Sequence, residues 1–249
     1  MDGLIIAAGY GSRLRELSDS KPLTPVAGVP LIELGVRRLA ACGIARVVVV
    51  TGHEGERVEA FLAALAARTG IAIECARVAD WSLPNGHSVI AGAARITGDY
   101  ILQMADHVFA PAIITGLMQQ GSPEHGVTLA VDTRTDSPLV DPDDATWVET
   151  GDGGLILAIG KTIAAYDAVD CGAFLATPEL AAAIAGALAD GKAGSLSDGM
   201  QRLADAGRAA TWDIGTDDSD AWWLDVDDPR AHALAEAEAP ARLPDLYRR

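Results

Sequence analysis

Short apolar runs of strand length alternate with segments of helical periodicity through the first half of the 249-residue chain. Such unbroken runs are typical of strands that are buried on both faces of a parallel sheet. The alternation therefore predicts an α/β fold with a mostly parallel central sheet, right-handed crossovers and helices on both faces. The predicted strands are 3–8, 46–50, 71–75 and 100–104, and the predicted helices are 31–42, 54–68 and 86–96.

The second half of the chain is less regular. Its pattern predicts strands over 128–132, 146–149, 155–159, 173–176 and 209–214, a helix that begins at Pro178, and a helix over 197–206. Ser197 is the expected N-cap of the last helix. The turn-rich segment 132–154 predicts a small β excursion over the active-site face. Since we find no internal repeat and no linker, we expect one domain that covers residues 1–249.

The composition excludes some classes of function. A formal net charge of −16 at pH 7 argues against nonspecific binding to nucleic acid or anionic lipid, because both need a basic surface. No apolar run reaches about 18 residues, and no leader pattern opens the chain, so we expect a cytoplasmic protein without membrane insertion. Cys42, Cys75 and Cys171 lack metal-ligand spacing, which predicts reduced, buried thiols.

A glycine-rich turn follows the first predicted strand and precedes two spaced cations. Gly9 and Gly11 allow backbone N–H groups to approach a phosphate closely, and Arg13 and Lys21 would neutralise its charge. The arrangement indicates a nucleoside triphosphate site at the carboxyl edge of the sheet. Leu14 replaces the third glycine of a dinucleotide fingerprint, and no Gly-Lys-Ser/Thr closes a P-loop here. A plain βα turn is the remaining alternative, which the two cations disfavour.

Carboxylates follow two other apolar segments. Asp106 lies just past the fourth predicted strand, and Asp225 and Asp227 alternate onto one face of a late apolar segment. Mg²⁺ is usually held by one or two carboxylates together with substrate phosphates, so these three residues are candidate magnesium ligands. Turn chemistry is the alternative for Asp106, and Asp228 is interpreted as the N-cap of the helix that follows.

Two further groups of polar residues suggest binding sites for a base and for an acceptor. The first group opens a predicted helix, where it would either read a base edge or form an ordinary turn and N-cap. The second group would offer a cation to a phosphate and a carboxylate to hydroxyl groups. The two groups are Asn85, Gly86 and Ser88, and Lys161, Tyr166 and Asp170.

In this order along the chain, these elements resemble the nucleotidyltransferases that join a sugar or alcohol phosphate to a nucleoside triphosphate, the MobA-like NTP transferase family. The resemblance rests on A-A-G-Y-G-S-R-L at 7–14, K-P-L-T-P-V-A-G-V-P-L-I-E at 21–33 and W-L-D-V-D-D-P at 223–229. Within the family, the CTP:inositol-1-phosphate cytidylyltransferases are most similar at N-G-H-S-V-I-A-G-A (85–93), M-A-D-H-V-F (104–109) and I-G-K-T-I-A-A-Y-D-A-V-D-C-G (159–172). The resemblance spans almost the whole chain and implies a Rossmann-like nucleotidyltransferase fold.

The resemblance also implies a reaction and a role for each candidate residue. The reaction would be a Mg²⁺-dependent transfer from CTP to inositol 1-phosphate, or a similar phosphorylated alcohol, that gives a CDP-alcohol and pyrophosphate. Arg13, Lys21 and Asp106 would be catalytic, and Asp106 and Asp227 would hold Mg²⁺, with Asp225 as a competitor. The nucleotide would bind at Ala7, Ala8, Gly9, Gly11, Asn85, Gly86 and Ser88. The acceptor would bind at Lys161, Tyr166 and Asp170.

Several alternatives stay open at this point. The acceptor is the least specified part, and hexose 1-phosphate, choline phosphate or a phosphonate would also suit a phosphate-binding lysine. A non-catalytic nucleotide-binding module is an alternative of another class. The best-known relatives carry a fused membrane domain, so we expect this chain to pass its product to a separate membrane transferase. A homodimer stays open as well.

Overall fold

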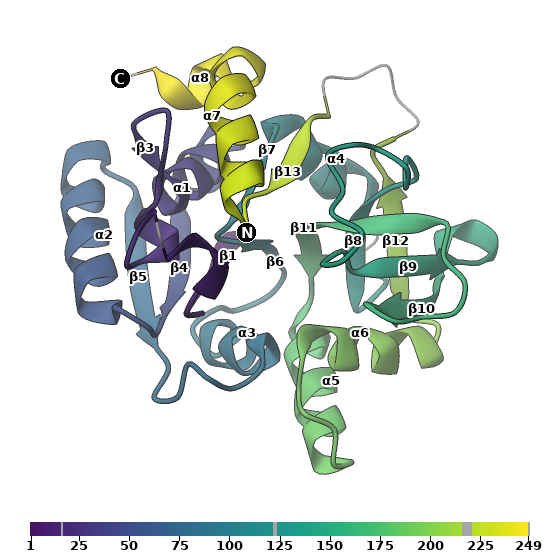
Figure 1. Cartoon of the computed structure of the whole chain (residues 1–249). Helices are drawn as coiled ribbons and strands as arrows, with labels where there is room; N and C mark the ends of the chain where they lie inside the picture. The colour runs from purple at the N-terminus through teal and green to yellow at the C-terminus, as the bar shows by residue number, and fades with distance from the viewer. Residues whose placement is uncertain (16, 122–123, 216–220, 249) are drawn as a thin grey trace.

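The protein is built around one nine-stranded sheet with the strand order β10-β9-β11-β6-β1-β4-β5, to which β8 and β12 are joined beside β11 (Figure 1). The computed structural model describes residues 1–15, 17–121, 124–215 and 221–248. In chain order, the strands of this sheet are β1 (Asp2–Ala7), β4 (Arg46–Thr51), β5 (Ala72–Arg77), β6 (Tyr100–Met104), β8 (Val127–Asp132), β9 (Trp147–Thr150), β10 (Ile156–Gly160), β11 (Ala168–Ala176) and β12 (Ala209–Asp213).

Helices cover both faces of the sheet, as the alternation along the strands requires. Ile5 and Val49 point to one face and pack with α1, α2 and α4, whereas Leu4 and Val50 point to the other face and pack with α3, α5 and α6. The central strands β1, β4 and β6 therefore bury both of their faces, which explains their unbroken apolar runs. The helices are α1 (Leu31–Ala41), α2 (Gly55–Thr69), α3 (Asn85–Ala93), α4 (Pro111–Gln120), α5 (Pro178–Ala189) and α6 (Leu196–Asp205).

The pairings confirm the predicted sheet. β5, β4, β1 and β6 pair in parallel, and β12 pairs in parallel with β8. β11 is antiparallel to β6, β8 and β9, so all strands of this sheet except β10 and β11 run in the same direction. β9 and β10 form the small β excursion, beside the segment 133–146 that precedes them (Figure 1).

The C-terminal segment returns to the edge of the sheet where β6 ends. The short strand β13 (Trp223–Asp225) pairs antiparallel with β7 (His107–Phe109), so that Asp225 lies opposite His107. The helices α7 (Pro229–Arg242) and α8 (Pro244–Tyr247) then pack in a third apolar cluster with α1, β13 and the hairpin of β2 (Pro25–Val26) and β3 (Val29–Pro30). The helix α7 accordingly contacts both β2 and β13, and Figure 1 shows it beside β13.

The structure corrects several details of the sequence-based assignment. Ser197 is not the N-cap of α6: the cap is Ser195, whose side chain and that of Asp198 form a capping box. The helix α4 was not expected from the pattern, and β11 begins at Ala168, five residues before the predicted strand. Cys171 is a buried free thiol as expected, whereas the other two free cysteines are only partly buried. Among the described helices, none combines the length and the hydrophobicity of a membrane-spanning segment.

Candidate active site

Two adjoining cavities open at the carboxyl ends of β1 and β6. The smaller has a volume of about 170 Å³ and is lined by Ala7, Ala8, Gly9, Gly11 and Lys21, among others. The larger, of about 220 Å³, lies toward β11, α6 and α7. Both cavities are lined by Asn85, Met104 and Asp106. The residues of the glycine-rich turn and the first carboxylate are thus brought together, at the sheet edge where α/β proteins bind ligands.

The glycine-rich turn has a local reason for its second glycine. Gly11 has φ of +62°, a left-handed conformation that disfavours residues with a Cβ. A Cβ at this position would also lie 2.4 Å from the Cβ of Lys21. Gly11 therefore allows Lys21, which belongs to the 3₁₀ turn η2 (Lys21–Leu23), to pack directly against the loop.

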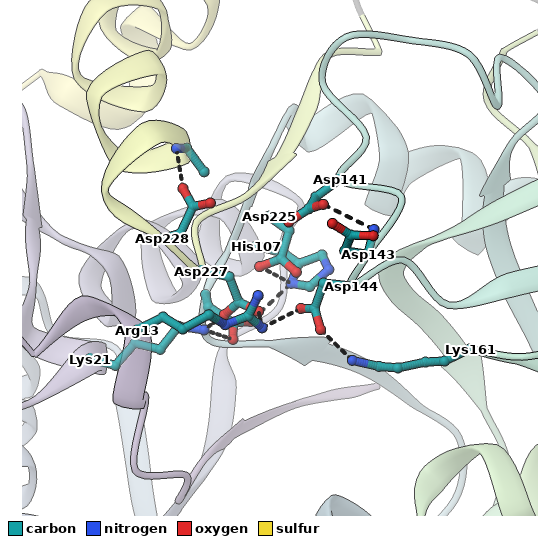
Figure 2. A network of polar contacts seen from close by, with 12 residues as sticks. Arg13, Lys21, His107, Asp141, Asp143, Asp144, Lys161, Asp225, Asp227 and Asp228 are labelled. Carbon is teal, nitrogen blue, oxygen red and sulfur yellow. Dashed lines mark hydrogen bonds and ion pairs between the residues drawn. The ribbon is translucent and has the colours of Figure 1, made fainter.

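Lys21 links the two distant acidic segments. Its Nζ lies 2.5 Å from Asp106 Oδ2 and also contacts Asp227 Oδ1, so both carboxylates reach one point in space (Figure 2). Asp227 forms a second ion pair, with Arg13, at 2.8 Å. Arg13 lines neither cavity, but its guanidinium also contacts Asp144 at 2.6 Å, and Asp144 contacts Lys161 at 2.5 Å.

His107 lies between two of the carboxylates, Asp106 and Asp225. Its Nδ1 lies 2.9 Å from Asp106 and 3.7 Å from Asp225, and its ring stacks on Trp223 with an interplanar angle of 11°. The buried Arg38 of α1 fixes the backbone here, since its guanidinium donates to the His107 carbonyl at 3.1 Å. Burial opposes a charge on His107, but Asp225, Asp106 and Asp170 outweigh it and raise the pKa of the imidazole to about 9.

The charge state of the carboxyl groups follows from the same neighbours. Burial opposes ionisation of Asp106, but Lys21 and His107 outweigh it and hold the pKa of this carboxyl well below its usual range. Burial and the charge of Asp106 raise the pKa of Asp225, against the opposing effect of His107. Asp106 is thus an anion at neutral pH, which is the state that a metal ligand needs.

The donor set fits a hard divalent cation. Two groups of ligand atoms lie close enough to share an ion, and Asp225 belongs to both: Asp106, His107 and Asp225, and Asp144, Asp225 and Asp227. Asp225 Oδ1 is buried and finds no hydrogen-bond partner among the described residues, which is an unfavourable state that a bound cation would relieve. Carboxylate oxygens are the preferred protein ligands of Mg²⁺.

Two of the three predicted acceptor residues line a cavity, and the third does not. Lys161 and Asp170 line the larger cavity, and burial raises the pKa of Asp170 to about 6 although Gly172 N–H donates to it at 2.7 Å. Tyr166 lies outside the lining of both cavities, where it stacks on Trp147 with 4.2 Å between ring centroids.

Two of the three predicted base-binding residues likewise line a cavity. Ser88 lines the smaller cavity, while Asn85 borders both and accepts a hydrogen bond from Leu196 N at 2.8 Å. Gly86 lines neither cavity: a Cβ there would lie 2.3 Å from Gly194 O, so this glycine serves the packing of α3 against the loop before α6. The N-cap of α3 is Pro84.

The structure adds residues that the sequence reasoning missed. Asp144 contacts both Arg13 and Lys161, yet in the sequence it is one of several acids in a turn-rich segment, and nothing marks it out. Arg230 lines the larger cavity, and it makes no hydrogen bond or ion pair with the described residues. Trp81, which the sequence suggested only as a possible aromatic partner of a choline-type acceptor, lines the smaller cavity, stacks on Tyr10 and is 40% exposed.

Comparison with known proteins finds relatives over most of the chain. Residues 3–206 match the family described as the MobA-like NTP transferase domain. A protein of Rubrobacter xylanophilus named bifunctional IPC transferase and DIPP synthase is 34% identical over 235 residues, which cover 93% of this chain and 50% of the relative. A protein of the same name from Aquifex aeolicus is 28% identical over 229 residues, 91% of this chain and 49% of the relative. The chain thus spans about half the length of these relatives.

A solved structure shares the fold over nearly the whole chain. The inositol-1-phosphate CTP transferase from T. maritima superimposes with a TM-score of 0.82 and covers 98% of this chain and 95% of its own. The sequence identity is 24%, so this likeness shows the fold and not the substrate.

Proposed function

Because the chain belongs to the MobA-like NTP transferase family, we propose that it is a cytidylyltransferase that joins CTP to inositol 1-phosphate, or to a similar phosphorylated alcohol. The products would be a CDP-alcohol and pyrophosphate. The observation that carries this proposal is the convergence of Lys21, Asp106 and Asp227 where the two cavities meet. The names of the relatives and of the structural neighbour support the choice of inositol phosphate and CTP.

The two cavities suit the two substrates. The triphosphate would bind in the smaller cavity, where the backbone at Ala8, Gly9 and Gly11 lies open beside Lys21. The acceptor would bind in the larger cavity, which offers Lys161 to a phosphate and the Asp170 carboxyl to hydroxyl groups. The shared wall at Asp106 would then bring the acceptor phosphate close to the α-phosphorus.

The proposed reaction is a direct displacement at phosphorus. An oxygen of the acceptor phosphate forms a bond to the α-phosphorus of CTP, and the bond from that phosphorus to the β-phosphate bridging oxygen breaks. The electron pair leaves with pyrophosphate. Since a phosphate nucleophile is already ionised near neutral pH, no general base is needed, and catalysis rests on alignment and charge stabilisation. Lys21 and Arg13 would offset the charge on the reacting and departing phosphates.

We assign the metal site to Asp106 and Asp227, with Asp225 as the third candidate ligand. Lys21 contacts Asp106 and Asp227, and His107 lies 3.7 Å from Asp225. Asp225 Oδ1 has no hydrogen-bond partner in the part of the chain that the structure describes. Mg²⁺ bound there would stabilise negative charge on the phosphoryl oxygens. The protein itself supplies the oxygen ligands and the cations that align both phosphates.

The test is a panel of nucleoside triphosphates against phosphorylated acceptors, read by pyrophosphate release. We expect CTP with inositol 1-phosphate to turn over fastest, and no turnover with any pair would contradict the proposal. Lys21→Ala and Asp106→Asn should each lower kcat by about a hundredfold, because one such contact contributes roughly 3 kcal/mol of transition-state stabilisation. Lys192→Ala, at an exposed lysine, is the matched control and should leave kcat unchanged.

The panel also separates the alternatives. Faster turnover with a hexose 1-phosphate, choline phosphate or a phosphonate would assign a different acceptor. CTP binding in calorimetry without pyrophosphate release from any pair would favour a non-catalytic module. Transfer of the product to a separate membrane enzyme, a homodimer and a cytoplasmic location stay predictions.

A further inference from the structure

Charged residues of the two cavity walls are joined through Arg13 into one continuous chain of ion pairs (Figure 2). Carboxylates and cations alternate along this chain. Lys21 and Arg13 each contact two carboxylates, and Lys161 contacts one. The order is Asp106, Lys21, Asp227, Arg13, Asp144 and Lys161.

Asp144 holds a special place in this chain because its two oxygens contact cations with different proposed ligands. Oδ2 contacts Arg13 Nη2 at 2.6 Å, and Oδ1 contacts Lys161 Nζ at 2.5 Å. Arg13 lies in the 3₁₀ turn η1 (Ser12–Leu14), directly after the glycine-rich turn that lines the smaller cavity, and Lys161 lines the larger cavity. The carboxylate therefore joins two segments that are far apart in the sequence.

The exposure of the three side chains indicates which partner is fixed. Asp144 is 17% exposed, whereas Arg13 and Lys161 are 46% and 57% exposed. Burial opposes ionisation of Asp144, but the hydrogen bonds from Lys161 and Arg13 outweigh it and lower its pKa, so the group is an anion. A short, largely buried carboxylate thus contacts two long, more exposed cations.

We infer that Asp144 is a positioning residue that aims Arg13 at the departing pyrophosphate and Lys161 at the acceptor phosphate. This inference rests on the proposed function. Long side chains lose rotamer freedom when they bind a phosphate, and a carboxylate that already restrains them removes part of that loss before the reaction. The same carboxylate competes with each phosphate for its cation, so it weakens ground-state binding while it improves alignment.

This dual effect predicts a split between kcat and KM. Asp144→Asn should lower kcat at least tenfold, which is about 1.4 kcal/mol of alignment, and leave both KM values unchanged or lower. Asp144→Glu keeps the charge and should recover part of kcat. The matched control is Asp143→Asn, which removes the same charge from the neighbouring residue outside the lining of either cavity, and should leave both parameters unchanged.

Two further readouts decide between this role and others. The magnesium concentration for half-maximal rate should stay the same in Asp144→Asn, since a rise would make Asp144 a metal ligand and overturn the inference. In metal-free calorimetry, inorganic pyrophosphate should bind about threefold more tightly to Asp144→Asn, in keeping with the small energy of an exposed ion pair. Equal or weaker binding would overturn the inference, as would an unchanged kcat or a raised KM.

The calorimetry keeps this test separate from that of the proposed function. If the wild type released no pyrophosphate from any substrate pair, the proposed function would fail, and the pyrophosphate affinities would still decide the role of Asp144. If Asp144→Asn did not fold, as judged by circular dichroism, the kcat of Asp144→Glu would decide. A value equal to that of the wild type would then refute the role.

Discussion

Gly172 offers a test of the inference that His107 positions the carboxylates Asp106 and Asp225 of the candidate site. Gly172 lies in β11 with φ of +73°, where the register with β8 shifts. A Cβ at this position would lie 2.3 Å from His107 Cδ2 and 2.6 Å from Cγ. The ring is hydrogen-bonded to Asp106 and stacked on Trp223, so a shift away from the added Cβ would disturb these contacts.

The expected loss of stability in Gly172→Ala has two parts. An alanine in the left-handed conformation costs about 1–2 kcal/mol. The forced contact with the imidazole adds about 1–3 kcal/mol, as is usual when an extra group enters a packed interior. The free energy of unfolding should therefore fall by about 2–5 kcal/mol. Since the imidazole must shift, its contacts with Asp106 and Asp225 should lengthen, and we expect kcat to fall at least tenfold.

Gly207→Ala isolates the contact from the backbone effect. Gly207 has φ of +67° and no atom within 4 Å of an added Cβ, so its substitution should show the backbone term alone. Urea unfolding of both variants gives the two free energies, and pyrophosphate release gives kcat. If Gly172→Ala lost no more stability than Gly207→Ala and kept its kcat, the support of the site by His107 would be refuted.

Three further predictions concern the acceptor cavity and its surroundings. If Arg230 binds the acceptor phosphate, Arg230→Ala should raise the KM for the acceptor at least tenfold without changing the KM for CTP, because a charge-assisted hydrogen bond to that phosphate would be lost. An equal rise in both KM values would place Arg230 elsewhere. The pKa of Asp170 is raised in the folded state from 3.8 to about 6, so its protonation stabilises the fold at low pH, and this stability is lost as the pH rises through 6. In urea unfolding, the free energy of unfolding of Asp170→Asn should therefore rise relative to that of the wild type by up to about 3 kcal/mol as the pH goes from 4 to 7. A difference between the two proteins that does not depend on pH would contradict the burial of this carboxyl. Ser195→Ala should lower the free energy of unfolding by about 1 kcal/mol and Ser197→Ala by less than half of that, whereas equal losses would contradict the capping box.

Local patterns were sufficient where one segment carries its own structural information. The strand 100–104 was predicted with the bounds that β6 has, because a short apolar run of strand length is the local signature of a strand that is buried on both faces. The helix α4 was not predicted, since its sequence contains Ile113, Ile114 and Gly116. Gly116 is explained only by packing: a Cβ there would lie 2.0 Å from the ring of Trp212 in β12.

The same distinction applies to the site. The amino-acid sequence by itself determined the glycine-rich turn, the cations near it and the carboxylates at the ends of apolar segments, because these features follow from backbone conformation and short spacings. Only the tertiary structure decided that Asp144 joins Arg13 to Lys161, that Tyr166 lies outside the cavity and that Arg230 lies on its wall. Arg13 and Asp144 are 131 residues apart, and a charge shows no partner until chain folding brings one within a few ångströms.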